Sequence, residues 1–572
     1  MATPGCARSP PAPHPDQHEG GPIVRPAARL LRGRRSATMF PLVAAADEEG
    51  AVLRQVREAS AMNVGVRFGK AAARGIAALT PPCVVAMFPL VLLVRAHITE
   101  YPFSVAVLVR PATMLAALAV IVFLLMRCVP VTRHCASLAT TLFFVVVGLF
   151  PLLFPPWSET NWPVAAGFTM ASLAIAVAAT KVLDGVVASA LSWALAVVVL
   201  WAMGATYLQG IAWPVPHWAE AVDRITARAQ AVHLAETREK PDIYYIIIDA
   251  MARADVLEEL YGVDASEAIA ELEALGFKVP RLSRANYSQT ALSIASSMNI
   301  QYLSELARVM GNDSDRRPLH RLVSTGGIVR SLKGLGYEFI VVGSSVSSIS
   351  QHAETDRCMC ELPPVPTELE HGLLVRTPLR GRYGDRAAMA AHRQRVLRSF
   401  DQIESTRSRG PMFLVAYIMT PHPPFVFDAD GGAVLDRRRY STLDGDGFSG
   451  PREEYLAEYS AQARFVLQRI ATLARRLVAE SPRAVIIVHS DHGSGLGLVN
   501  MNASRTDPRE RLAIFSAYYA GGRDASVPED ISPVNALRWA VRVGLNAHLP
   551  LLPNRSHLSD YPRPYRWVEM PP

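Results

Sequence analysis

The chain has 572 residues, 50% of them hydrophobic, and a formal net charge of +7. Its length exceeds that of one typical domain, and its mean hydropathy of +0.17 is too high for an ordinary soluble protein. The apolar excess lies mostly between about residues 79 and 208, so we expect a membrane region and a separate globular region.

Residues 1–76 are rich in Arg and Pro and contain no long apolar run. Such a composition predicts a disordered tail, or residues that precede a true start at Met39 or Met62. A basic flank on the cytoplasmic side of a membrane anchor explains the positive charge better than nucleic-acid binding does. We therefore expect no nucleic-acid partner.

The region 77–208 is expected to form five membrane spans, each close to the ~20 apolar residues that cross a bilayer. Arg110 lies within the second span, where it either snorkels or faces a polar groove, unless that span starts later. The loop 127–136 and Lys181 carry the basic residues that favour the cytoplasmic side. This puts the N-terminus inside, and an odd number of spans puts everything after residue 208 outside. The predicted spans are 77–95, 103–126, 137–155, 163–181 and 185–208.

Residues 209–240 form a connector with helical apolar spacing at Trp218, Val222, Ile225 and Ala229. The spacing fits a helix on the membrane surface or an ordinary linker helix. Farther along, Cys358 and Cys360 are the cysteines outside the tail and the membrane region. They form either a local disulfide or a pair of free thiols, and no paired CxxC supports a zinc knuckle.

Residues 241–572 are predicted to form an α/β domain. Near-continuous apolar runs suited to buried strands alternate with helical segments, which indicates a mostly parallel sheet. The strands are expected at 243–248, 338–343, 412–419, 484–489 and 512–520, and the helices at 253–275, 320–335, 385–406 and 451–480.

Chemically useful side chains follow three of these strands. Asp249 follows the first, His422 follows the third, and Asp491 and His492 follow the fourth. A single polar residue after a strand is usually a turn former or a helix cap. Ligands bind at the carboxyl ends of parallel strands, however, and two aspartates with an imidazole suit zinc, manganese or magnesium.

The segment 286–299, "NYSQTALSIASSMN", offers hydroxyl groups at the start of a predicted helix, where backbone N–H groups favour an anion. It supplies a candidate nucleophile, although a capped, Ser-rich helix start is the simpler interpretation. The glycines at 493, 495 and 497 fit neither a dinucleotide fingerprint nor a phosphate loop and predict a flexible loop beside the site. The hydroxyls are those of Ser288, Thr290, Ser293, Ser296 and Ser297.

In order, "DIYYIIIDA", "SQTALSIASSMN" and "VHSDHG" resemble the alkaline phosphatase and sulfatase superfamily, over roughly residues 241–520. They are most similar to its membrane-anchored branch, the phosphoethanolamine transferases and lipoteichoic acid synthases, which have about five spans and an extracytoplasmic catalytic domain. The resemblance implies that Asp249, Asp491 and His492 hold a metal. It makes Thr290 the nucleophile and a further metal-binding residue, and His422 a contact of the transferred phosphate or leaving group.

Two departures limit what the resemblance implies. No C/S-x-P-x-R segment lies near 286–299, so sulfate ester hydrolysis is not expected. Asp249 stands where the branch usually has glutamate, so the substrates of its members do not transfer directly. A second metal would need further ligands, and the available His320, His352 and His489 are expected to be core or surface histidines.

The sequence thus predicts an inner-membrane protein with a bundle of about five spans and an extracytoplasmic, alkaline-phosphatase-like α/β domain. The expected activity moves a phosphoethanolamine- or phosphoglycerol-type group from a lipid phosphodiester donor to an envelope lipid or glycan. The reaction would use one divalent ion, zinc or manganese before magnesium, and a threonine intermediate. The alternatives are a phosphatase or phosphodiesterase that uses water and a non-catalytic membrane scaffold. A transporter is disfavoured, because apart from Arg110 the spans are poor in ionisable residues.

Overall fold

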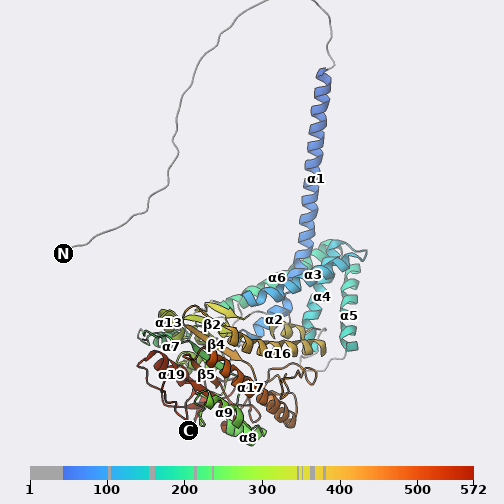
Figure 1. Ribbon diagram of the computed structural model, residues 1–572. Coiled ribbons are helices and arrows are strands. Elements are labelled where there is room, and N and C mark those ends of the chain that lie inside the picture. The colour runs from blue at the N-terminus through green and yellow to red at the C-terminus, as the bar shows by residue number, and fades with distance from the viewer. Residues whose placement is uncertain are drawn as a thin grey trace, which may run out of the picture. The chain divides into compact units, whose positions relative to one another are not determined.

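Figure 1 shows the computed structural model of the chain. It describes residues 43–100, 105–153, 162–211, 216–232, 234, 237–343, 347–350, 352–360, 368–377 and 382–571. The chain divides into two compact units, Met1–Ala73 and Arg74–Pro572.

In the first unit, the described residues belong to α1 (Val43–Val85), a helix that begins in this unit. The prediction of disorder through residue 76 is therefore wrong for residues 43–76, and residues 1–42 lie outside the described residues. The Arg- and Pro-rich composition that suggested disorder belongs to the first forty residues. From Val43 on, the chain is rich in Ala, Glu and Arg, which are strong helix formers.

The predicted spans are found as apolar helices. The first combines the end of α1 with α2 (Phe88–His97), and a turn separates the two where Pro81, Pro82 and Pro89 cluster. Among the described residues, four segments are long and apolar enough to cross a membrane: Gly69–His97, Val107–Arg127, Arg133–Pro151 and Gly185–Leu208. The predicted span 163–181 corresponds to a shorter apolar stretch, Ala166–Ala179. The helices are α3 (Val105–Arg127), α4 (Arg133–Leu153), α5 (Trp162–Val182) and α6 (Gly185–Ile211).

Large apolar side chains on these helices remain exposed, among them Leu124 on α3 and Trp201 on α6. Exposed apolar surface on this scale is typical of a membrane-facing bundle. Arg110 of α3 forms an ion pair. Its Nε lies 3.1 Å from Oε1 of the buried Glu370 on α15 (Glu368–Leu374).

The connector contains α7 (Ala219–Gln230), and its apolar face is buried against the globular region. The helix contacts α13 (Gly327–Gly334) and α12 (Arg317–Ser324). The side chains of Trp218, Val222 and Ile225 are 5% exposed or less. Of the two alternatives for this segment, the structure therefore shows an ordinary packed helix rather than one that lies on a membrane.

A six-stranded sheet in the order β3-β2-β4-β1-β5-β6 forms the centre of the globular region. Its first five strands are parallel and β6 runs antiparallel to β5. This confirms the mostly parallel sheet, and each predicted strand is present. The strands are β1 (Ile243–Ile248), β2 (Glu338–Val342), β3 (Arg357–Met359), β4 (Met412–Ile418), β5 (Val485–Ser490) and β6 (Ser516–Tyr519).

Three details of the predicted pattern differ. The edge strand β3 was not predicted, because its three residues are half-buried or exposed and form no apolar run. The predicted helix 253–275 is broken into α8 (Ala254–Tyr261) and α9 (Ser266–Ala274) by Gly262, whose φ of +60° ends a helix. The predicted helix 320–335 is likewise divided between α12 and α13.

Helices cover both faces of the sheet, and each face has its own apolar core. One core joins alternate strand residues such as Tyr245 and Ile247 to α7, α12, α13 and two further helices, α10 (Thr290–Met298) and α19 (Pro533–Leu545). The other joins Tyr244 and Ile246 to α8, α9, α16 (Arg382–Ser405) and α17 (Arg452–Glu480). The strands are buried on both sides, as a parallel sheet requires.

Short elements and loops complete the region. A disulfide joins Cys358 and Cys360 at β3, which settles the alternative left open by the sequence and fits a compartment outside the cytoplasm. The other elements are α11 (Ser304–Met310), α14 (Ser347–Ser350), η1 (Gly445–Gly447), η2 (Ala503–Arg505), α18 (Pro508–Leu512), and the hairpin of β7 (Ser556–Ser559) and β8 (Trp567–Met570).

Candidate active site

The carboxyl ends of three adjacent strands form the site. Ile248, the last residue of β1, pairs with Ile418 of β4 on one side and with Ser490 of β5 on the other. The residues that follow these strands must therefore emerge at one edge of the sheet. The backbone N–H of His422 also donates to the carbonyl of Asp249, at 3.3 Å, which ties the loop after β4 to the loop after β1.

Asp249 and Asp491 are both buried, with exposed fractions of 1% and 0%. The hydroxyl of Tyr417 donates to Asp249 Oδ2, and the backbone N–H of Ala250 lies 3.4 Å from Asp491 Oδ1. Within the described part of the chain, the other oxygens, Asp249 Oδ1 and Asp491 Oδ2, have no hydrogen-bond partner. Burial raises the pKa of both carboxyl groups.

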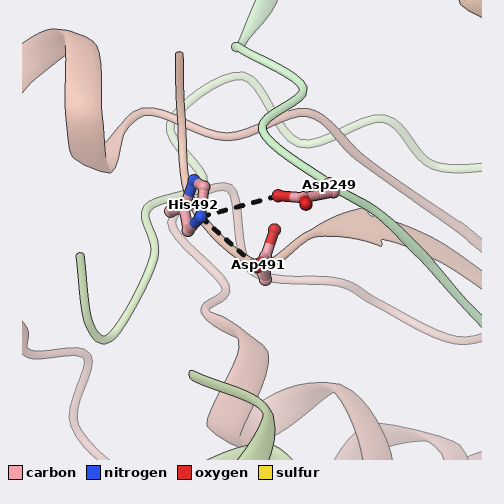
Figure 2. A group of neighbouring side chains, drawn as sticks. All are labelled: Asp249, Asp491 and His492. Atoms are coloured by element: carbon pink, nitrogen blue, oxygen red, sulfur yellow. Dashed lines mark ion pairs between the residues drawn. The ribbon is translucent and has the colours of Figure 1, made fainter. Parts of the chain in front are cut away.

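His492 faces these two unpartnered oxygens (Figure 2). Its Nδ1–H donates to the carbonyl of Gly493 at 3.0 Å, which leaves the lone pair on Nε2. Nε2 lies 3.5 Å from Asp249 Oδ1 and 3.5 Å from Asp491 Oδ2. Burial lowers the pKa of His492 to about 3, so the imidazole is neutral.

The three side chains together form a candidate metal centre, with one ligand atom from each lying within 4.8 Å of the others. Buried polar atoms in folded proteins are almost always partnered, and two carboxylates brought together are costly without a cation. Two carboxylate oxygens and an imidazole nitrogen suit zinc or manganese. The ligand set predicted from the sequence is therefore brought together by the fold.

Thr290 is the first residue of α10, and its Oγ1 lies 3.0 Å from His492 Nε2. The preceding Gln289 anchors this helix start, because its Nε2 donates to Ser559 Oγ at 2.8 Å and its Oε1 accepts from Arg316 at 2.8 Å. Of the candidate hydroxyls, Thr290 is the one that meets the metal centre. Ser296 donates to the backbone carbonyl of Gln301, and Ser297 donates to that of Ile294.

His422 lies close to the candidate metal centre, with its ring centroid 6.3 Å from that of His492. Its Nδ1–H donates to the carbonyl of Pro423 at 2.7 Å, and its Nε2 lies 3.9 Å from Oδ2 of Asp444. Burial alone would lower the pKa of His422, but the charges of Asp249 and Asp444 outweigh it and raise that pKa.

Several residues of the site were not predicted. Tyr417 lies within an apolar strand, and the sequence alone does not reveal that its hydroxyl points at Asp249. Asp444 lies in a polar loop, where it accepts from Tyr455 at 2.7 Å and from Arg511 at 3.1 Å. Burial opposes ionisation of Asp444, but His422 and Arg511 lower its pKa overall. No local pattern marks Asp444 or Arg511, because only tertiary contacts bring them to the site.

The glycine segment after His492 is not the flexible loop that the sequence suggested. A Cβ on Gly493 would lie 2.0 Å from the carbonyl of Glu510, and one on Gly495 would lie 2.2 Å from Asp444 Oδ2. The buried Glu510 carboxylate accepts from the Ser494 hydroxyl and from the N–H groups of Leu496 and Gly497, each at 2.7 Å. The glycines permit a close approach of backbone rather than mobility.

The histidines considered for a second metal are elsewhere in the fold, as expected of core residues. His489 donates to the carbonyl of Ser490 and packs on Tyr245, and His352 packs on Phe339. His320 contacts the carbonyl of Glu100. Among the described residues, the group formed by Asp249, Asp491 and His492 is the one that could hold a metal.

The fold and the site thus define an α/β domain with a candidate metal centre at the carboxyl edge of its sheet, next to a hydroxyl group. No protein-family model matches the chain, and no curated protein matches it.

Several solved structures resemble it. The zinc complex of the C-terminal periplasmic domain of EcEptC from Escherichia coli is 13% identical, with a TM-score of 0.40, over 59% of this chain and 95% of that one. The integral membrane lipooligosaccharide phosphoethanolamine transferase A from Neisseria meningitidis is 13% identical, with a TM-score of 0.33, over 82% and 95%. The phosphonate monoester hydrolase SpPMH from Silicibacter pomeroyi is 15% identical, with a TM-score of 0.33, over 54% and 74%. At such TM-scores and identities these resemblances do not define the function of this chain.

Proposed function

We propose that this protein is a metal-dependent, membrane-bound phosphotransferase of the alkaline phosphatase and sulfatase superfamily. The observation that carries the proposal is the placement of the Thr290 hydroxyl 3.0 Å from His492 Nε2, in a buried group with two unpartnered carboxylate oxygens. A hydroxyl beside a divalent ion is a common arrangement for an activated nucleophile.

The proposed ligands of the ion are Asp249, Asp491 and His492, with Thr290 beside them. A bound divalent ion would polarise a phosphoryl oxygen and lower the pKa of a neighbouring hydroxyl. Tyr417 holds Asp249 and the carbonyl of Gly493 holds the imidazole, so both ligands are oriented by a second set of hydrogen bonds.

In the proposed reaction, Thr290 Oγ1 attacks the phosphorus of a phosphodiester in line. A bond forms between Oγ1 and phosphorus, the bond to the first alcohol breaks, and that alcohol leaves with a proton. A second alcohol then attacks the phosphorus of the phospho-threonine. The bond between phosphorus and Thr290 Oγ1 breaks, and Oγ1 takes up the proton that the second alcohol loses. The N–H groups at the start of α10 favour the charge on the transferred group, and His422 is proposed to contact that group or the leaving alcohol.

The membrane helices support a lipid phosphodiester as donor and an envelope lipid or glycan as acceptor. A site tethered near a bilayer meets lipid substrates at a raised effective concentration. We propose phosphoethanolamine or phosphoglycerol as the transferred group, an N-terminus in the cytoplasm, and a globular domain on the outer side of the inner membrane. A hydrolase that uses water as acceptor would employ the same site.

The test uses the purified full chain in detergent, with bis(4-nitrophenyl) phosphate as substrate and metal content measured in parallel. The expected result is about one divalent ion per chain, loss of the ion in Asp491→Asn, and loss of turnover with the ion retained in Thr290→Ala. Asp430→Asn changes an exposed aspartate and Thr472→Ala changes a half-buried threonine on α17, and the two serve as matched controls. A folded wild-type chain that binds no zinc, manganese or magnesium and has no activity would point to a membrane scaffold instead.

A further inference from the structure

Arg511 is a buried arginine whose guanidinium is held by three separate segments of the chain. Its Nε donates to the carbonyl of Ser288 at 2.9 Å, just before the Thr290 helix. Its Nη1 donates to Asp444 Oδ2 at 3.1 Å and to the carbonyl of Gly493 at 3.2 Å. These contacts fix the plane of the guanidinium.

The remaining nitrogen, Nη2, points at the reactive part of the site. It lies 3.2 Å from His492 Nε2, the same atom that lies 3.0 Å from Thr290 Oγ1. In the described part of the chain, Nη2 meets no carboxylate or carbonyl acceptor. A guanidinium that served only to tie loops together would be expected to have protein oxygens on all three nitrogens, and this one has them on two.

We propose that Arg511 is a substrate-binding catalytic residue whose Nη2 binds a non-bridging oxygen of the phosphoryl group transferred to Thr290. Asp444 is its positioning residue. This inference rests on the proposed function. A metal ion would bind His492 through the lone pair on Nε2. With that lone pair occupied, the Nη2–H groups of Arg511 would need another acceptor. An oxygen of the transferred phosphoryl group supplies one.

The chemistry of a phosphodiester fits this arrangement. Its phosphorus carries two non-bridging oxygens, so one can face the metal centre while the other faces the guanidinium. Arginine is suited to this role because its donors are rigid, always charged, and form strong hydrogen bonds with phosphate. While the bond from Thr290 forms and the bond to the leaving alcohol breaks, the guanidinium would stabilise the charge on that oxygen.

The test compares Arg511→Gln and Arg511→Lys with the wild-type full chain in detergent, all loaded with zinc. Arg509→Gln is the matched control, because Arg509 lies on the same short helix but forms exposed ion pairs with Asp255 and Glu259. The measurements are zinc per chain, the Kd of inorganic phosphate by titration calorimetry, and kcat and KM for bis(4-nitrophenyl) phosphate. We expect Arg511→Gln to keep its zinc, to weaken phosphate binding at least tenfold, and to lower kcat/KM at least as much. Arg511→Lys should fall between, and the control should stay within twofold of wild type.

Two results would overturn the inference. One is a phosphate Kd in Arg511→Gln equal to that of Arg509→Gln. The other is loss of zinc together with loss of phosphate affinity in Arg511→Gln, which would show that Arg511 stabilises the segment that carries the metal ligand His492. If Arg511→Gln does not fold, Arg511→Lys provides the test. A phosphate Kd and a kcat/KM equal to those of the wild type in that variant would equally overturn the proposed role of the Arg511 guanidinium. A wild-type chain that neither binds phosphate nor turns over would instead contradict the proposed function itself.

Discussion

The hydroxyl of Thr290 and the imidazole of His492 lie 3.0 Å apart although 202 residues separate them in the chain. Neither position depends on a long loop. Thr290 is fixed as the first residue of a helix, and His492 is fixed two residues after a buried strand. A catalytic pair placed by the ends of regular elements is held more precisely than one placed by loops.

Removal of a bound divalent ion should destabilise the globular region, because the Asp249 and Asp491 carboxylates would lose their shared partner. Ligand binding at a hundredfold excess over Kd stabilises by about 2.7 kcal/mol. We expect EDTA to lower the Tm of the wild-type chain by several degrees and zinc to restore it. The Tm of Asp491→Asn should not respond to either, and an equal response in that variant would place the stabilising ion elsewhere.

Substitution of Ile225 in α7 should weaken the globular region rather than any membrane attachment. Ile225 is fully buried at the contact of α7 with α12 and α13, and Ile→Ala in a core costs about 2–5 kcal/mol. We expect Ile225→Ala to lower the Tm of the globular region markedly, while Arg224→Ala, at the exposed neighbouring position, changes it little. Equal, small effects of both would contradict the packing of α7.

Stability should fall as the pH drops below about 6.5, since several buried imidazoles outside the site are held neutral. Burial lowers the pKa of His352 and His489 to about 4 and that of His392 to about 3, from an ordinary value of 6.5. The unfolded chain therefore takes up protons first as the pH falls, and the stability present above pH 6.5 is lost toward pH 4.

Each such imidazole should contribute about 1.4 kcal/mol of lost stability per pH unit within this window. The measurement is denaturant unfolding between pH 7.5 and 5.5, in the wild type and in His489→Phe. We expect a shallower pH dependence in the variant, and identical slopes would show that His489 is not held neutral by burial.

The orientation of the chain in the membrane can be tested by thiol labelling. The proposed topology puts Cys128, which is exposed at the end of α3, on the cytoplasmic side, and Leu282, 56% exposed, on the outer side. A membrane-impermeant maleimide applied to spheroplasts of an expressing bacterium should label Leu282→Cys at once and Cys128 only after permeabilisation. Labelling in the reverse order would show that the chain has the opposite orientation in the membrane.

The sequence predicted those parts of the fold that depend on apolar pattern alone. The run 243–248 could be assigned as a strand because a buried parallel strand has few polar residues, and Asp249, Asp491 and His492 stood out because they interrupt such runs. Arg511, Asp444 and Tyr417 could not be found in this way. Their roles depend on which side chain meets which across the fold, and an arginine before an edge strand or a tyrosine within a core strand has no distinctive spacing.

Two expectations from the sequence were wrong for comparable reasons. Residues 43–76 form a helix because the Arg- and Pro-rich composition of the first forty residues, which predicts disorder, does not continue past them. The glycines after His492 suggested mobility, whereas their close approach to Glu510 and Asp444 requires them. A glycine signals only that a side chain is absent, and its reason becomes visible with its neighbours in place.

The central claim is that Thr290 forms a covalent bond to the transferred phosphoryl group. It is tested most directly by mass spectrometry of the tryptic peptide of residues 285–308 after acid quenching of a reaction with a phosphodiester substrate. We predict a phosphorus-containing adduct on Thr290 that forms in the presence of the divalent ion, does not form when EDTA is added before the substrate, and is absent in Thr290→Ala. Steady turnover with an unmodified Thr290 peptide, and with full activity retained in Thr290→Ala, would contradict the mechanism.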